Sequence, residues 1–274
     1  MHNQLKRREH KDYKSTCLIP QSSEIVKTVN LDYYAPQLYM PKHDHSVGQF
    51  STLLSGKAYE YNLNGELYNR PGVAEFKPVA YSHSNRIGPD GALFLSINLH
   101  SDHEAFVAEF GRVNWKLIDQ TVAKRLWHTL TLMLFQSERA LNVDIDEVVL
   151  GLLSQSLPGN HIIKKAPVWL CLAEQALNET QMSLEEIARY VGVHRVHLSR
   201  VFQSYFSLSV SQYKQRVALQ RSMTAMLREH DSISLAGAQA GFADQSHFTR
   251  TMKKQFGITP NRLRSLFSSS SVVA

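Results

Sequence analysis

The chain has 274 residues, of which 43% are apolar and 20% charged, a length that allows two domains with separate cores. No run of 18 apolar residues occurs, and the basic segment Lys6-Arg7-Arg8 leads into no apolar stretch, so we expect neither a membrane span nor a secretory signal. The two cysteines, Cys17 and Cys171, are far apart, which argues against a disulfide framework and indicates a cytoplasmic protein.

The net charge of +6 is unevenly distributed. Residues 166–274 carry 12 Lys and Arg against 7 Asp and Glu, whereas residues 1–165 carry 18 against 17. A basic C-terminal half indicates a polyanionic partner such as nucleic acid, although many solvated surfaces are also basic.

In chain order, residues 1–20 are predicted to be a basic tail, and residues 21–102 a domain of short strands. Turn signals separate the apolar and tyrosine-rich runs at Asn64-Gly65, Pro71-Gly72 and Pro89-Asp90-Gly91. Many short strands joined by such turns are typical of a barrel or sandwich.

Two clusters in this region share a spacing with the two motifs of the cupin barrel. The first is His43-Asp44-His45, Gln49 and Gly56, and the second is Gly72, Pro78, Ala80 and His83. The resemblance implies a cupin-like barrel in which Gln49 replaces the usual Glu and Ala80 the usual Gly. Alternate residues on a strand point the same way, so the imidazoles can converge on a divalent metal. We identify as candidate metal ligands His43, His45, Gln49 and His83.

The interior of such a barrel is the expected pocket for a small-molecule effector. The sequence alone does not decide which aromatic side chains face inward. The candidate lining residues are Tyr39, Phe50, Tyr59 and Tyr81.

Residues 103–160 contain few glycines and prolines, and their apolar residues follow a helical spacing, as in Leu126, Leu130, Met133 and Leu134. We predict a helical linker here that holds two chains together as a homodimer. Leu157-Pro158-Gly159-Asn160 ends this segment.

Residues 166–266 are predicted to be all helical, with one pattern that occurs twice. Ser183-Leu184-Glu185-Glu186 is a capping box, and Gly192 suits the left-handed position after the helix. Ser232 and Gly241 repeat this arrangement 49 residues later, and a second helix follows each glycine. A short helix, a glycine turn and a second helix with a polar face describe a helix-turn-helix.

The second helix of such a unit enters the major groove of DNA, where arginine can bond guanine and glutamine can bond adenine through two hydrogen bonds each. Two units can reach successive turns of the groove about 34 Å apart. The polar residues exposed on the predicted second helices are Arg195, Ser199, Arg200, Gln245, Ser246, Thr249 and Arg250.

Residues 183–264 resemble the DNA-binding domain of the AraC/XylS family of bacterial transcription regulators. The most specific stretch runs from Gly241 to Arg250 and is followed by Phe256-Gly257-Ile258-Thr259-Pro260. The resemblance implies double-stranded promoter DNA as partner and adds Val196 to the base-reading positions. Gly237 departs from the family's usual alanine, at a cost of about 1 kcal/mol in helix stability.

The leading hypothesis is an α+β two-domain regulator that is not an enzyme: an effector binds the cupin-like barrel, and the double helix-turn-helix binds DNA. RNA polymerase is a further candidate partner. Two alternatives stay open: the barrel serves only oligomerisation, or it is a metal-dependent enzyme. We expect no membrane partner.

Overall fold

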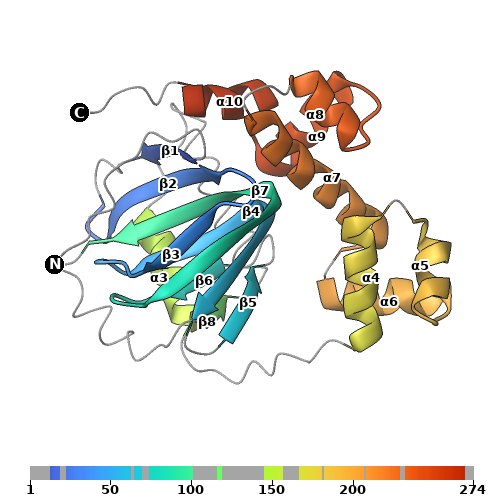
Figure 1. The fold of residues 1–274 in the computed structure, drawn as a ribbon, viewed down its shortest axis with the longest axis horizontal. Coiled ribbons are helices and arrows are strands. Elements are labelled where there is room, and N and C mark those ends of the chain that lie inside the picture. Colours follow the sequence, from blue (N-terminus) through green and yellow to red (C-terminus); the bar gives the residue numbers. More distant parts are fainter. Residues whose placement is uncertain are drawn as a thin grey trace. The chain divides into compact units, whose positions relative to one another are not determined.

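The computed structural model describes residues 13–18, 23–62, 65–69, 74–100, 116–118, 145–156, 167–180, 182–206, 208–228 and 232–268. They form an antiparallel β-sheet region followed by helices, which confirms the predicted fold class (Figure 1). By its internal contacts the chain divides into two units, residues 160–220 in one and residues 1–159 with 221–274 in the other. No helix in the described residues is long and apolar enough to span a membrane.

Eight strands form one antiparallel sheet in the order β1-β2-β7-β4-β6-β8, with β3 paired to β7 and β5 paired to β4. The two longest strands organise it, because β7 pairs with β2, β3 and β4, while β4 also pairs with β5 and β6. The bounds are β1 Tyr13–Leu18, β2 Val26–Tyr34, β3 Tyr39–His43, β4 Gln49–Asn62, β5 Gly65–Asn69, β6 Ala74–Lys77, β7 His83–Leu99 and β8 Lys116–Ile118.

Both long strands carry a glycine with positive φ near the middle, at Gly56 on β4 and Gly91 on β7. The register between the strands shifts on both sides of Gly56, and a Cβ placed there would lie only 1.9 Å from the carbonyl oxygen of Gly91. The two backbones therefore approach at a distance that only glycine permits.

Three expectations for this region need correction. Residues 13–18, predicted as part of the tail, form β1 and pair with β2, so the sheet begins earlier than expected. Pro89-Asp90-Gly91, predicted as a turn between strands, lies within β7. Residues 116–118, predicted as part of a helical linker, form β8 and pair with β6, because backbone pairing with an existing strand outweighs local helical spacing.

The rest of the predicted linker is described only in part. Helix α3 (Ile145–Ser156) packs against β2 and β8, with Ile145 and Val149 buried. The carboxylate of Asp146 accepts a hydrogen bond from the Ser23 hydroxyl and another from the Glu24 amide. The predicted dimer interface runs from Leu126 to Leu153. Its first part, up to Leu134, lies outside the described residues, and Val149 in its second part is buried within this chain, so dimerisation stays a prediction.

Seven further helices follow, as predicted for residues 166–266 (Figure 1). The connecting helix α7 begins at Val210, one residue before the predicted start at Ser211. The boundary between the two units lies within this helix. The bounds are α4 Val168–Glu179, α5 Leu184–Tyr190, α6 Arg195–Phe206, α7 Val210–Leu227, α8 Ile233–Gln239, α9 Gln245–Phe256 and α10 Pro260–Ser268.

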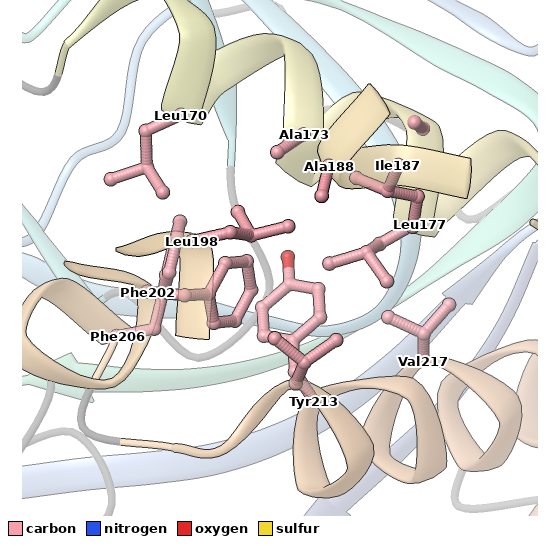
Figure 2. Packing of buried hydrophobic residues seen from close by; sticks show 12 residues of the cluster. Leu170, Ala173, Leu177, Ile187, Ala188, Leu198, Phe202, Phe206, Tyr213 and Val217 are labelled. Atoms are coloured by element: carbon pink, nitrogen blue, oxygen red, sulfur yellow. The ribbon is translucent and has the colours of Figure 1, made fainter. Parts of the chain in front are cut away.

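The first helix-turn-helix unit has its own apolar core. Figure 2 shows Leu198 and Phe202 of α6 packed between residues of α4, α5 and α7. Tyr213 closes this core from α7: its ring lies edge-on to Phe202 at 5.1 Å, and its hydroxyl donates to the Glu174 carboxylate at 2.8 Å. This packing holds α6 in a fixed orientation with its opposite face exposed.

Candidate functional site

Helices α5 and α6 form the first predicted pair, and local signals set their ends. The Ser183 hydroxyl accepts from the amide of Glu186, while the Glu186 carboxylate accepts from the amide of Ser183, so the predicted capping box is confirmed. Gly192 has a φ of 73°, as a left-handed turn between two helices requires. The sharp turn that a helix-turn-helix needs is therefore present.

Helix α6 presents a polar face opposite its core. Leu198 and Phe202 are fully buried, whereas Arg195 and Arg200 are exposed and 43% of Val196 is exposed. Ser199 is half-buried on the same outward side. The four predicted positions are thus brought to one outward side of α6.

Helices α8 and α9 repeat the arrangement. The Ser232 hydroxyl caps α8 by accepting from the amide of Leu235, and Gly241 has a φ of 92°. Asp244 caps α9 by accepting from the amide of His247 at 2.6 Å. This cap was not identified from the sequence, although Asp directly before a helix is a typical capping signal. The cap lies in the turn between α8 and α9, which is one residue longer than the turn between α5 and α6.

Helix α9 also separates a buried face from an exposed one. Phe248 and Met252 are fully buried, while Gln245, Ser246 and Arg250 are exposed. Thr249 is half-buried beside them. All four predicted positions of the second unit therefore lie on the outward side of α9.

Arg200 and Arg250 have no ion-pair or hydrogen-bond partner among the residues that the structure describes. A purely structural role for these arginines, in salt bridges that hold the fold together, thus has no support in that part of the chain. Their guanidinium groups keep all donors available for another molecule.

One exposed position of α6 was not singled out in the sequence. Gln203 follows Ser199 by four residues and Arg200 by three, which puts it on the same outward side one turn later. The same helical spacing in the sequence could have identified it. The corresponding residue of α9 is the exposed Lys253.

A second constellation lies in the sheet region. The imidazoles of His43, His45 and His83 are neighbours, with ring centroids 4.4, 5.1 and 5.3 Å apart in pairs. A nitrogen from each ring lies within 4.8 Å of the others, as ligands of one metal ion must. We call these three residues the histidine cluster. The structure therefore brings together three of the four predicted metal ligands.

Backbone hydrogen bonds determine the tautomers in this cluster. Nδ1 of His43 lies 2.8 Å from the carbonyl oxygen of Pro41, and Nδ1 of His83 lies 3.2 Å from that of Tyr81. A carbonyl only accepts, so each Nδ1 carries the proton and each neutral ring keeps a lone pair on Nε2. Metal-binding histidines typically have such a bond on their other nitrogen.

Two of the three imidazoles are held uncharged at neutral pH. Burial, the other two histidines and Lys77 together lower the pKa of His45 to about 3. Burial, Lys77 and His43 likewise lower the pKa of His83 to about 3. Neutral imidazoles are the form that binds metal.

Two buried charged residues lie beside the cluster. The Lys77 ammonium is 2.6 Å from Oε2 of Glu60, and both side chains are almost fully buried. The Tyr81 hydroxyl donates to Oε1 of Glu60 at 3.1 Å and accepts from the Asn62 amide at 2.6 Å. Burial and the Glu60 charge raise the pKa of Tyr81, so this hydroxyl stays protonated. Sequence reasoning did not find the Glu60–Lys77 pair.

The other predicted residues of this region are spread over the sheet. The Gln49 amide donates to the Asn98 side chain at 2.9 Å. Tyr81 lies beside His83, with ring centroids 5.5 Å apart. Phe50 packs on Phe76, Tyr59 lies under Arg86, and 59% of Tyr39 is exposed, so of the four predicted lining residues only Tyr81 joins the cluster.

Comparison with known proteins supports the interpretation of the helical region as helix-turn-helix units. Residues 187–265 match a family described as "Helix-turn-helix domain". The chain is 32% identical over 93 residues to the HTH-type transcriptional regulator ArgR of Pseudomonas aeruginosa, which is 34% of this chain and 28% of that protein. It is also 32% identical over 110 residues to the regulator GbdR of the same species, which is 39% of this chain and 30% of that protein.

Among solved structures, an AraC-type transcriptional regulator from Chromobacterium violaceum is 31% identical and covers 38% of this chain and 91% of its own, with a TM-score of 0.33. The chain thus spans under a third of the length of these two curated relatives. Residues 187–265 of this chain form a helix-turn-helix domain similar to those of these bacterial transcription regulators.

Proposed function

We propose that this protein is a sequence-specific DNA-binding transcription regulator. The observation that carries the proposal is the repeated outward face: α6 and α9 each bury one side in a core and each expose an arginine that has no partner among the described residues. A helix that enters the major groove needs such a face, because base edges are read by side chains that the fold leaves free.

The side chains of the two helices differ in what they can read. Arg200 and Arg250 match the paired acceptors of guanine, and Gln245 matches adenine. Val196 is suited to the methyl group of thymine, since it is apolar and nearly half exposed. Because the two faces differ, one chain reads an asymmetric site.

The sheet region is proposed as the regulatory part, which binds a small molecule and changes how strongly the helices bind DNA. Such control requires the effector to bind one state of the protein more tightly than the other. Support for a polar site comes from the cluster formed by the histidines, Tyr81 and Glu60. We propose that the protein acts as a homodimer in the cytoplasm and contacts RNA polymerase at its promoters.

The test of DNA recognition is selection of bound sequences from a random duplex pool with the full-length protein at near-physiological salt. We expect two short conserved blocks, one for each helix. Loss of one block in Arg200→Ala and of the other in Arg250→Ala would assign the helices. Enrichment of no sequence, both with the full chain and with residues 166–274, would refute sequence-specific binding.

We further propose that the histidine cluster binds a divalent transition metal. The hydrogen bonds of His43 and His83 to backbone carbonyls support this, because they leave two Nε2 lone pairs beside the third imidazole. Imidazole suits zinc, copper, iron and nickel. A bound ion would link β3 to the start of β7 through His43 and His83, which pair across these two strands.

Metal content of the purified protein tests this second proposal. We expect about one equivalent of metal per chain after incubation with zinc and gel filtration, and none for His43→Ala with His83→Ala in the same chain. Equal retention by both proteins would place the metal elsewhere.

A further inference from the structure

The histidine cluster has an electrostatic requirement that its own residues do not meet. Three neutral imidazoles supply lone pairs but no negative charge, so a divalent ion among them would keep its full charge in a largely buried site. Buried charge is costly unless an opposite charge lies close by. Gln49, at the position where the first motif usually has a carboxylate, is an uncharged amide bonded to Asn98. A carboxylate from another residue would supply the missing negative charge.

Glu60 is the candidate. Its negative charge acts on His45, but its carboxylate lies outside the group of ligand atoms that the three imidazoles form within 4.8 Å, so it would have to turn toward them when a metal binds. It pairs with Asn85 across β4 and β7, and His83 lies two residues before Asn85 on the same face of β7. Diagonal neighbours of this kind have Cα atoms about 7–8 Å apart, within reach of long side chains. Tyr81 completes the connection, because its ring lies beside His83 while its hydroxyl donates to Oε1 of Glu60.

The second oxygen of Glu60 is incompletely used. Oε2 is fully buried and lies 2.6 Å from the Lys77 ammonium, yet it accepts no well-aligned hydrogen bond. The carboxylate therefore has one oxygen held by Tyr81 and another held only by the attraction of a neighbouring cation. A metal ion could take over that second oxygen without breaking the bond from Tyr81.

We propose that Glu60, rather than Gln49, is the carboxylate that binds a divalent metal together with the histidine cluster, and that Lys77 competes with the metal for it. This inference rests on the proposed metal binding by the three histidines. In the metal-free protein the Lys77 charge balances Glu60. In the loaded protein the ion does so, and Lys77 has to leave its buried position or release its proton, because an unpaired buried ammonium is costly. The same pair would then link metal binding to a rearrangement on β6, which carries Lys77.

Two variants of the pair separate this role from a structural one, because they change metal affinity in opposite directions. Glu60→Gln removes the carboxylate and should weaken Co²⁺ binding by about 10- to 100-fold, the range found when groups around a metal site are removed. It should also change the visible absorption of the bound cobalt. Lys77→Met removes the competitor and should tighten Co²⁺ binding several-fold. A pair that only supports the fold would weaken binding in both variants.

The experiment is a Co²⁺ titration of the full-length protein, followed by calorimetry and visible absorption. Glu60→Gln with Lys77→Met removes both buried charges together, so it keeps a folded reference if a single variant unfolds; it should bind as weakly as Glu60→Gln. Gln49→Met is the matched control and should bind like the unmodified protein.

Each result decides between the proposals. If the unmodified protein binds no Co²⁺, the metal site itself is refuted, and this inference with it. If the unmodified protein binds Co²⁺ and Glu60→Gln binds it with the same affinity and spectrum, only the role of Glu60 is refuted. Loss of affinity in Gln49→Met with no loss in Glu60→Gln would return the ligand role to Gln49.

Discussion

Replacement of Arg200 or Arg250 by alanine tests DNA recognition most directly, because neither change should disturb the fold. Neither guanidinium has a partner among the described residues, and both are exposed. Surface substitutions away from packing or bonding features change stability by no more than about 0.5 kcal/mol. The fold should therefore survive either change, and any loss of DNA binding can be assigned to the interface.

A bidentate arginine–guanine contact is worth about 1–3 kcal/mol of discrimination. At about 1.4 kcal/mol for each factor of ten, either variant should raise Kd on its selected site by roughly 5- to 150-fold. Fluorescence anisotropy with the selected duplex and with duplexes mutated at single positions measures both affinity and specificity. The reasoning is refuted if either variant loses affinity equally on every duplex, since that pattern belongs to a phosphate contact.

Three other substitutions give distinct outcomes. Lys253→Ala should weaken binding to all duplexes about equally and lower the slope of log K against log salt by about 1, as measured by a salt titration; a sequence-dependent loss would instead make this lysine a base reader. Asp32→Asn should raise the free energy of unfolding at pH 8, because burial raises the pKa of Asp32 in the folded state, so the folded protein loses stability as pH rises above the unfolded pKa of about 3.9. Urea unfolding at pH 8 and pH 5 should show that this gain in stability is smaller at pH 5. A larger gain at pH 5 would contradict a raised pKa of Asp32. Ala80→Gly should stabilise the sheet region by about 0.5–1 kcal/mol, since Ala80 has a φ of 60° and relief of about 1–2 kcal/mol exceeds the extra entropy of glycine in the unfolded chain; thermal unfolding measures this, and a lower Tm would show that the left-handed conformation carries no strain.

The helical half was largely predictable, because its signals are local. The Ser183 capping box and the positive φ of Gly192 and Gly241 depend only on residues within one or two turns of the chain. Helical spacing then separated the core residue Phe202 from the exposed Arg200. Such features need no knowledge of what the rest of the chain does.

The sheet region was less predictable, because its decisive contacts join distant residues. The sequence predicts that β1 belongs to a tail, because no residue near Tyr13 indicates that its hydroxyl donates a hydrogen bond to the buried carboxylate of Asp32. Gly91 resembled a turn residue, whereas its conformation serves a close approach to Gly56, 35 positions earlier in the chain. Lys77 and Glu60 carried no signal at all, because charged residues are almost never fully buried unless they are paired, and the pairing appears only in the fold.

Gly237 shows how the fold can reverse a conclusion drawn from propensity. Glycine inside a helix costs about 1 kcal/mol, so helix propensity alone predicts that the second helix-turn-helix unit is the less stable of the two. In the structure a Cβ at this position would lie 3.2 Å from Cδ1 of Phe248, a fully buried ring that also packs on Phe242 at 5.1 Å. An added methyl group would have to displace that ring, and overpacking of a core costs about 1–3 kcal/mol, at least as much as the gain in helix propensity. The glycine thus lets α8 and α9 approach closely, and that contact fixes the direction in which α9 presents Gln245 and Arg250.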